Sequence, residues 1–252
     1  MNKLWLFTAG AVALSCGFVG PAAAQAYRVP AGTPAYIRAA VESAERPEAM
    51  TERDAARKPA EVLSLSGVEP GDKLIEIAGF GNYYTILLSA IVGAEGEVHM
   101  FDLPYTEQMA GDNSRAFVAA HPNTTYTLVD YNEAQFPQDV DVVFNVLYYH
   151  DLGPQNIDTA AMNRKLLAAL KPGGRYVIID HKAEDGSGWR DAGTIHRMGV
   201  ETIVEELTAA GFELSVNSDL LANPDDDRTQ MVFSPGTRGA TDRAVFVFTK
   251  PE

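Results

Sequence analysis

Cysteine is almost absent from this sequence, since Cys16 is the only one among 252 residues. It falls within residues 1–26, which we interpret as a segment that is removed. The mature chain would then contain no thiol. That composition excludes disulfides, cysteine nucleophiles, iron–sulfur clusters and zinc sites built from thiolates.

Long hydrophobic runs are missing beyond the N-terminus. The run over 4–19 carries no charge, but it is shorter than the ~20 apolar residues that a membrane span needs. Small residues follow it at the spacing that signal peptidase accepts, so we predict a signal peptide over 1–26, cleaved after Ala26 or after Ala24. A retained anchor and lipidation of Cys16 fit this segment less well. We therefore expect a periplasmic or secreted protein with no stable membrane span after signal removal.

Basic residues are scarce relative to acids. The chain has 20 Lys and Arg against 34 Asp and Glu, a formal charge of −14, which becomes −15 without the signal peptide because one lysine and no acid leaves with it. A chain this acidic has no basic face with which to neutralise phosphates, so we expect no nucleic-acid partner. Hydrophobic residues make up 46% of the chain, enough for a globular core. Nothing in the sequence indicates the oligomeric state.

Two kinds of pattern divide the mature chain. Residues 27–66 are polar and helical in pattern, with a helix expected over 50–57, and we interpret them as an N-terminal helical cap. Residues 67–252 alternate strands with helices such as 157–170, which predicts an α/β, doubly wound, seven-stranded, mostly parallel sheet with a ligand crevice at the carboxyl ends of its strands. The strands are expected over 73–78, 97–101, 124–129, 140–147, 175–180, 212–216 and 244–249.

Acids and glycines follow the first three predicted strands. Glu76 is followed by a loop with Gly79 and Gly81, whose lack of a Cβ lets a ligand approach the backbone. Asp102 follows the second strand, where an acid can accept hydrogen bonds from both hydroxyls of a ribose, and Asp130 follows the third, where it could contact an adenine edge. Helix capping remains the alternative role for each acid.

Histidines follow the fourth and fifth predicted strands. His150 and His181 lie at the crevice edge, each beside an aspartate, and His196 lies in the next segment. We predict that His150, or as second choice His181, removes a proton from a substrate; a hydrogen-bonded structural role is the alternative for each. These imidazoles also suit a metal, but no tight spacing such as H-x-x-x-H supports one, so no metal site is predicted.

Several segments resemble class I S-adenosylmethionine-dependent methyltransferases. The sequence LKPGG over 170–174 precedes the fifth strand, as in that family, and the order of elements agrees. AARKPAEVLSLSGVEPGDKLIEI from Ala55, and HRMGVETIVEELTAAGFEL from His196 followed by NPDDDRTQMVFSP, resemble an exported bacterial branch of predicted methyltransferases. The resemblance spans essentially the whole mature chain. It implies a class I methyltransferase-like Rossmann fold, S-adenosylmethionine as methyl donor, and a small-molecule acceptor that the sequence does not identify.

The loop after the first strand departs from that family. Ala78, Phe80 and Asn82 stand where such enzymes have glycines, and Phe80 would place a ring where the methionine part of the donor normally runs. An exported ligand-binding protein, or a repurposed fold that no longer uses the cofactor, is therefore the alternative. Export also favours it, because the donor is not expected to be made outside the cytoplasm. A metal-assisted hydrolase using the histidines is a third hypothesis.

Overall fold

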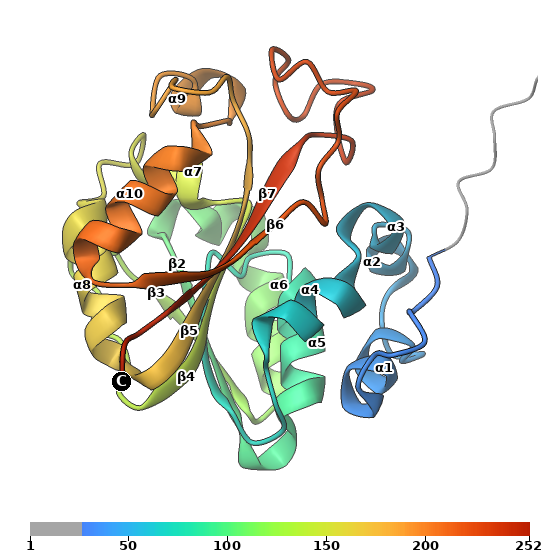
Figure 1. The fold of residues 1–252 in the computed structure, drawn as a ribbon. Helices are drawn as coiled ribbons and strands as arrows, with labels where there is room; N and C mark the ends of the chain where they lie inside the picture. The colour runs from blue at the N-terminus through green and yellow to red at the C-terminus, as the bar shows by residue number, and fades with distance from the viewer. Residues whose placement is uncertain (1–26) are drawn as a thin grey trace, which may run out of the picture.

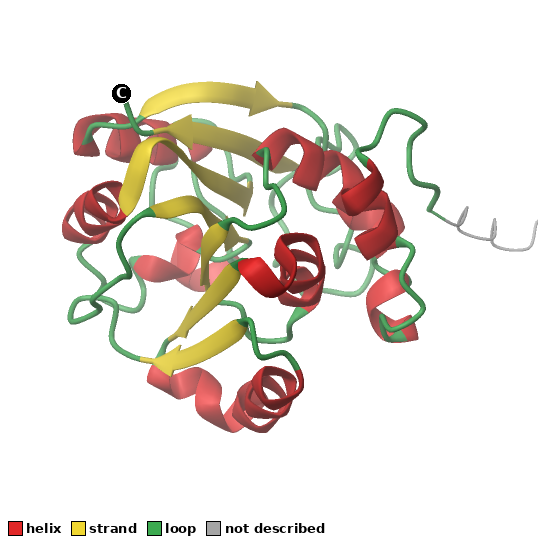
Figure 2. Cartoon of the chain, turned by 90° about the horizontal axis from the view of Figure 1, so that it is seen from below, coloured by secondary structure: helices red, strands yellow, loops and turns green. Residues whose placement is uncertain are grey.

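A seven-stranded sheet with helices on both faces forms the centre of the molecule (Figures 1 and 2). The computed structural model describes residues 27–252, so the predicted signal peptide lies outside the described residues. The strands are β1 (Lys73–Ile77), β2 (Glu97–Asp102), β3 (Thr124–Leu128), β4 (Val140–Val146), β5 (Leu170–His181), β6 (Glu213–Ser218) and β7 (Arg243–Thr249).

The strand order is β3-β2-β1-β4-β5-β7-β6. Strands β1 to β5 are parallel to one another, and β7 runs antiparallel to both β5 and β6. The predicted doubly wound, mostly parallel α/β sheet is confirmed. So is the central place expected for the fourth strand, whose apolar run Val140–Val146 lies in the middle of the sheet.

Helices and short 3-10 turns connect these strands. They are α1 (Ala35–Val41), α2 (Glu48–Thr51), α3 (Asp54–Arg57), α4 (Pro59–Ser66), α5 (Tyr83–Val92), η1 (Gly93–Glu95), η2 (Pro104–Thr106), α6 (Glu107–Ala120), α7 (Tyr149–Leu152), α8 (Thr159–Ala169), α9 (Ala192–Ile195) and α10 (Val200–Ala210). Among the described residues, no helix has the length and apolarity needed to cross a membrane.

Successive side chains of the central strands belong to two separate hydrophobic cores, one on each face of the sheet. On β4, Val142 and Phe144 pack with helices α1, α4 and α5, whereas Val143 faces the core that contains residues of α8 and α10. Because successive side chains of a strand point to opposite faces, a continuous apolar run serves both cores at once. Figure 2 shows the helices on either side of the strands.

Two predicted helices have different bounds in the structure. The helix expected over 50–57 is two short helices, α2 and α3, because the chain turns at Glu52–Arg53. The helix expected over 157–170 ends at Ala169, and the Lys171–Gly174 turn lies inside the strand assignment of β5 instead of before it. Neither difference moves the carboxyl ends of the strands, where the candidate site lies.

Candidate active site

The loop between β1 and α5 forms one wall of the candidate site. Ala78 and Asn82 have positive φ angles of 59° and 55°, and Gly81 has 89°, a left-handed conformation that suits glycine. Gly79 is needed for a different reason, since a Cβ there would lie 3.0 Å from Oε2 of Glu76. The two glycines predicted to matter are therefore both fixed by local geometry.

Glu76 and Asp102 are both buried beneath this loop. Glu76 is 5% exposed and accepts a hydrogen bond from the Thr85 hydroxyl at 2.7 Å. Burial raises its pKa to about 8, helped by the charge of Asp102. Burial also raises the pKa of Asp102 to about 7, although the backbone N–H groups of Phe80 and Gly79 offset part of that rise.

Of the two buried carboxylates, Asp102 is the one with the poorer hydrogen bonding. It has no exposed surface, and within residues 27–252 its oxygens make no well-formed hydrogen bond, although the backbone N–H groups of Gly79 and Phe80 lie close to them. An unpaired buried carboxylate is costly, so such a group in a fold's crevice is a candidate for ligand binding. This is the position at which the sequence predicts a ribose-binding acid.

Asp130 lies apart from the other predicted donor-binding residues. It is exposed after β3, and its Oδ1 accepts a hydrogen bond from the backbone N–H of Asn132 at 2.9 Å. It does not line the cavity described below. The predicted contact with an adenine edge stays a prediction.

A cavity of about 260 Å³ lies at the carboxyl ends of β1, β4 and β5. It adjoins a second hollow of about 620 Å³ between helix α3 and the 219–242 segment. Both predicted histidines His150 and His181 line the first cavity, with Glu76, Gly79 and Gly81. The two hollows share Arg53, Arg57, Leu147, His181, Phe233 and Arg238.

Phe80 lies at this cavity and not in the helix layer. Its half-buried ring contacts Tyr148 edge to face, with ring centroids 5.9 Å apart. The hydroxyl of Tyr148 in turn lies 2.9 Å from that of Tyr105. The ring therefore narrows the space beside the glycine loop, as its position in the sequence suggested.

His181 is a neutral imidazole with one nitrogen engaged. Its Nδ1 lies 2.8 Å from the hydroxyl oxygen of the buried Thr241, and Nε2 has no hydrogen-bond partner among residues 27–252. Burial lowers its pKa well below 6.5, and the nearby positive groups, His150 first and then Arg243, act in the same direction. Its free nitrogen is available at the cavity wall.

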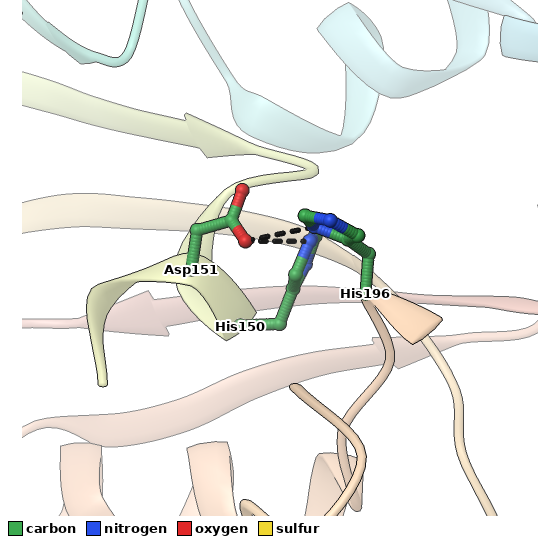
Figure 3. A group of neighbouring side chains, drawn as sticks. All are labelled: His150, Asp151 and His196. Atoms are coloured by element: carbon green, nitrogen blue, oxygen red, sulfur yellow. Dashed lines mark hydrogen bonds and ion pairs between the residues drawn. The ribbon is translucent and has the colours of Figure 1, made fainter. Parts of the chain in front are cut away.

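His150 is surrounded by carboxylates. Its Nδ1 lies 2.6 Å from Oδ1 of Asp180, and its Nε2 lies 3.5 Å from Oδ1 of Asp151. Burial alone lowers its pKa, but the charge and hydrogen bond of Asp180, with the charge of Asp151, outweigh burial and raise that pKa above 6.5. His196 joins this group through Nδ1, which lies 2.9 Å from the same oxygen of Asp151 (Figure 3).

The sequence interpretation missed the arginines of the site. Arg57 lies over the Tyr83 ring with its Cζ 4.4 Å from the centroid, and Arg53 lies 5.2 Å from the same centroid. Neither of them, nor Arg238, makes a salt bridge or a side-chain hydrogen bond with any residue the structure describes. The spacing of Arg53 and Arg57, four residues apart, could have signalled a shared helical face, but not that the face meets the sheet.

A buried ion pair holds the segment that carries Phe233 and Arg238. The guanidinium of Arg197 has no exposed surface and bonds both oxygens of Asp226, at 2.7 and 3.1 Å. Asp226 also accepts the backbone N–H of Asp242 at 2.6 Å. This fixes the far wall of the cavity against the end of β5.

Known proteins with this architecture are numerous. This chain is similar in structure to a methyltransferase of Aquifex aeolicus described as SAM-dependent, at a TM-score of 0.56 and 16% identity over 75% of this chain and 88% of that chain. The fold is that of the class I methyltransferases. The chain is also similar in structure to a [4+2]-cyclase, SpnF, at a TM-score of 0.56 and 16% identity, covering 82% of this chain and 86% of that one.

Sequence similarity is confined to part of the chain. No family model matches it. It is 29% identical over 126 residues to the ubiquinone/menaquinone biosynthesis C-methyltransferase UbiE of Teredinibacter turnerae, covering 50% of this chain and 49% of that protein. With UbiE of Idiomarina loihiensis it is 31% identical over 119 residues, or 47% of this chain and 46% of that protein. The chain thus spans about half the length of these relatives.

Proposed function

We propose that this protein transfers a methyl group from S-adenosylmethionine to a small-molecule acceptor. The observation that carries the proposal is the buried Asp102 at the end of β2, whose carboxylate has only the nearby backbone N–H groups of Gly79 and Phe80 and no well-formed hydrogen bond within residues 27–252. A ribose would supply two adjacent hydroxyl donors to that carboxylate, the usual contact of the acid after the second strand of nucleoside-binding sheets. Similarity to C-methyltransferases over half of the chain supports the same reaction.

The donor would lie along the glycine loop. Gly79 and Gly81 let the chain turn close to a ligand, and Glu76 lies beneath the loop, where it accepts a hydrogen bond from the Thr85 hydroxyl. Because Asp102 has no exposed surface, a ribose reaches it only if loop 78–82 moves. Asp130 is proposed for the adenine side, beyond the end of β3.

The acceptor would lie between the histidines and the arginines. S-adenosylmethionine supplies an electrophilic methyl group on its sulfur. When the acceptor attacks that carbon, the S–CH₃ bond breaks, S-adenosylhomocysteine leaves, and the acceptor's proton moves to Nε2 of His181. We favour His181 as this base because Thr241 holds its other nitrogen, while Nε2 has no partner among the described residues. His150 stays the alternative base, through its Nε2 at the same cavity.

The charge of the cavity points to an acidic acceptor. Arg53, Arg57 and Arg238 line it with no carboxylate partner in the described part of the chain, whose full sequence has a formal charge of −14. Burial, and then the positive charge of Arg57, lowers the pKa of Arg53 to about 10. A carboxylate or phosphate group on the acceptor would balance this cluster and select for anionic small molecules.

We also propose that the protein is exported and belongs to the exported branch that it resembles. The apolar run and small residues of the first 26 positions support removal of a signal peptide. N-terminal sequencing of protein from its own host tests this. A start at Tyr27 or Gln25 agrees with the proposal, whereas a start at Met1 or Asn2 contradicts it.

Calorimetry with both forms of the cofactor tests the methyl-transfer proposal. We expect one molecule of S-adenosylmethionine, or of S-adenosylhomocysteine, to bind the folded protein. Binding of neither, in a sample whose circular dichroism shows an intact fold, overturns it and favours a fold that no longer uses the cofactor.

A further inference from the structure

Three side chains from two distant segments meet at the rim of the cavity (Figure 3). His150 and Asp151 belong to α7, directly after β4, whereas His196 follows α9, 45 residues after Asp151. Each offers one nitrogen or oxygen atom, and these atoms all lie within 4.8 Å of one another. Two imidazoles and one carboxylate around a single point are the ligand set of many divalent metal sites.

The spacing of the three groups fits a shared cation. Oδ1 of Asp151 lies 3.5 Å from Nε2 of His150 and 2.9 Å from Nδ1 of His196. Ligands at about 2.1 Å from a metal are about 3.0–3.4 Å from their neighbours in octahedral or tetrahedral geometry. The rings of His150 and His196 are nearly perpendicular, at 88°, so their lone pairs approach Asp151 from different directions.

A second carboxylate orients the first imidazole. Oδ1 of Asp180 accepts from Nδ1 of His150 at 2.6 Å, which leaves Nε2 as the lone pair that faces Asp151. Asp180 has no exposed surface and is itself fixed by the backbone N–H groups of His150 and His181, both at 2.7 Å. Histidines that bind metals characteristically donate their other N–H to a carboxylate or carbonyl in this way.

The charge of the cluster also calls for a cation. Neither Asp151 nor Asp180 forms a salt bridge with a lysine or arginine in the part of the chain that the structure describes. The two carboxylates therefore pair only with the imidazoles of His150 and His196 among the side chains described. A divalent ion would balance their negative charge. The side chains of Asp151 and His196 keep 18% and 28% exposure, so an ion can enter from the cavity.

We propose that His150 Nε2, Asp151 Oδ1 and His196 Nδ1 bind one divalent transition-metal ion, such as Zn²⁺, Mn²⁺ or Fe²⁺. Among the described residues only these three ligands converge, so coordination positions stay open toward the cavity, as in catalytic and not structural metal sites. Those positions suit oxygen atoms of a bound small molecule. His181 is not a ligand in this arrangement and keeps its free nitrogen, whereas a metal on Nε2 of His150 would leave His181 as the base. The proposal does not rest on methyl transfer, because the metal is bound by side chains alone.

Metal titration of protein made without an affinity tag tests this site. After removal of metals with EDTA, the protein is titrated with Zn²⁺ by calorimetry and with Co²⁺ by visible spectroscopy. We expect one ion per chain, and a Co²⁺ spectrum that reports nitrogen and oxygen ligands. His196→Ala and Asp151→Asn should each weaken Zn²⁺ binding by at least a hundredfold, and Asp180→Asn by about 10- to 100-fold.

His99→Ala is the matched control. His99 also lies beside an acid, with Nε2 2.8 Å from Glu97, but on β2 and away from the cluster. It should leave Zn²⁺ affinity unchanged. The proposal is overturned if the folded wild type binds no stoichiometric ion, or if His196→Ala binds it as tightly as wild type. S-adenosylhomocysteine affinity, measured on the same samples, separates failure of the metal site from failure of the methyl-transfer proposal.

Discussion

Nδ1 of His150 lies 2.6 Å from Oδ1 of Asp180, and neither side chain is exposed by more than 2%. The two residues lie at the carboxyl ends of neighbouring strands: Asp180 is on β5, and His150 is in the short helix that follows β4. The other oxygen of Asp180 accepts the backbone N–H of His150 at 2.7 Å. One carboxylate therefore fixes both the ring and the backbone that carry the histidine into the cavity.

Replacing this carboxylate should cost stability. Asp180→Asn keeps the shape of the side chain but removes the charge that pairs with His150, and breaking one partner of a buried pair costs about 3 kcal/mol. Denaturant unfolding measures the loss. Asp112→Asn is the control, because Asp112 is fully exposed and surface ion pairs contribute about 1 kcal/mol or less. Equal losses of unfolding free energy in the two variants would show that the buried contact contributes no more than a surface ion pair.

Asp102→Asn should separate ligand binding from folding. The amide removes an unpaired buried charge, so we expect the free energy of unfolding to stay the same or rise. Affinity for S-adenosylhomocysteine should fall at least tenfold, about 1.4 kcal/mol, because the ribose loses a charged acceptor. Calorimetry on both proteins measures this. An unchanged affinity would remove Asp102 from the site; Asp130→Asn, at an exposed position, should have the smaller effect.

Glu76 should make stability depend on pH. Its pKa is about 8 in the folded protein and near 4.5 when unfolded, so between these values the folded state binds the extra proton. Stability from this group therefore falls as pH rises from about 4.5 to about 8. Glu76→Gln removes that dependence, and should exceed wild type by about 1–3 kcal/mol at pH 8–9 while matching it near pH 5.

Urea unfolding at a series of pH values tests the Glu76 prediction. The quantity to follow is the difference between the variant and wild type, because Asp102 titrates with the same sign, with a pKa of about 7, in both proteins. A difference that does not grow with pH contradicts the prediction. Glu205→Gln, at an exposed position on α10 with no side-chain hydrogen bond in the described part of the chain, serves as a control for the substitution itself.

The sequence was sufficient to predict the sheet because its strands have a strong local signal. The segment Val140–Val146 has apolar residues on both of its faces, which is typical of a central strand in a parallel sheet. The break at Glu52–Arg53 was not predictable in this way, because both residues are compatible with a continuous helix. In the structure the Arg53 guanidinium lies over the Tyr83 ring, a tertiary contact that the local sequence does not show. Strand positions follow from local pattern, whereas cap geometry follows from tertiary contacts.

From the sequence, only the part of the candidate site that lies at strand ends could be predicted. His150, His181 and Asp102 come directly after or at the end of strands, so their convergence follows from topology. His196 and Arg238 belong to the loops after β5 and β6, whose path depends on the buried Arg197–Asp226 pair. No spacing in the sequence predicts which residues of a long loop come to lie beside the ends of the strands.

The arginines should give the cavity affinity for anions. We expect 10 mM inorganic phosphate to raise the melting temperature of wild type by about 2–4 °C, as a millimolar site would. Arg238→Gln and Arg57→Gln should each lose most of that shift. Arg164→Gln, an exposed arginine on α8 far from the cavity, should keep it. Equal shifts in all four proteins, measured by differential scanning fluorimetry, would place phosphate elsewhere.

Phe80→Ala should bind the donor more tightly than wild type. The ring lies between the glycine loop and Tyr148, with centroids 5.9 Å apart, where the donor's methionine part is expected. Since the ring is only half-buried, its removal should cost about 1–2 kcal/mol of stability, less than a full core truncation. Affinity for S-adenosylhomocysteine should rise several-fold. Binding by Phe80→Ala but not by wild type would show that this ring closes the cofactor site. Weaker binding by the variant would instead make the ring a contact of the ligand.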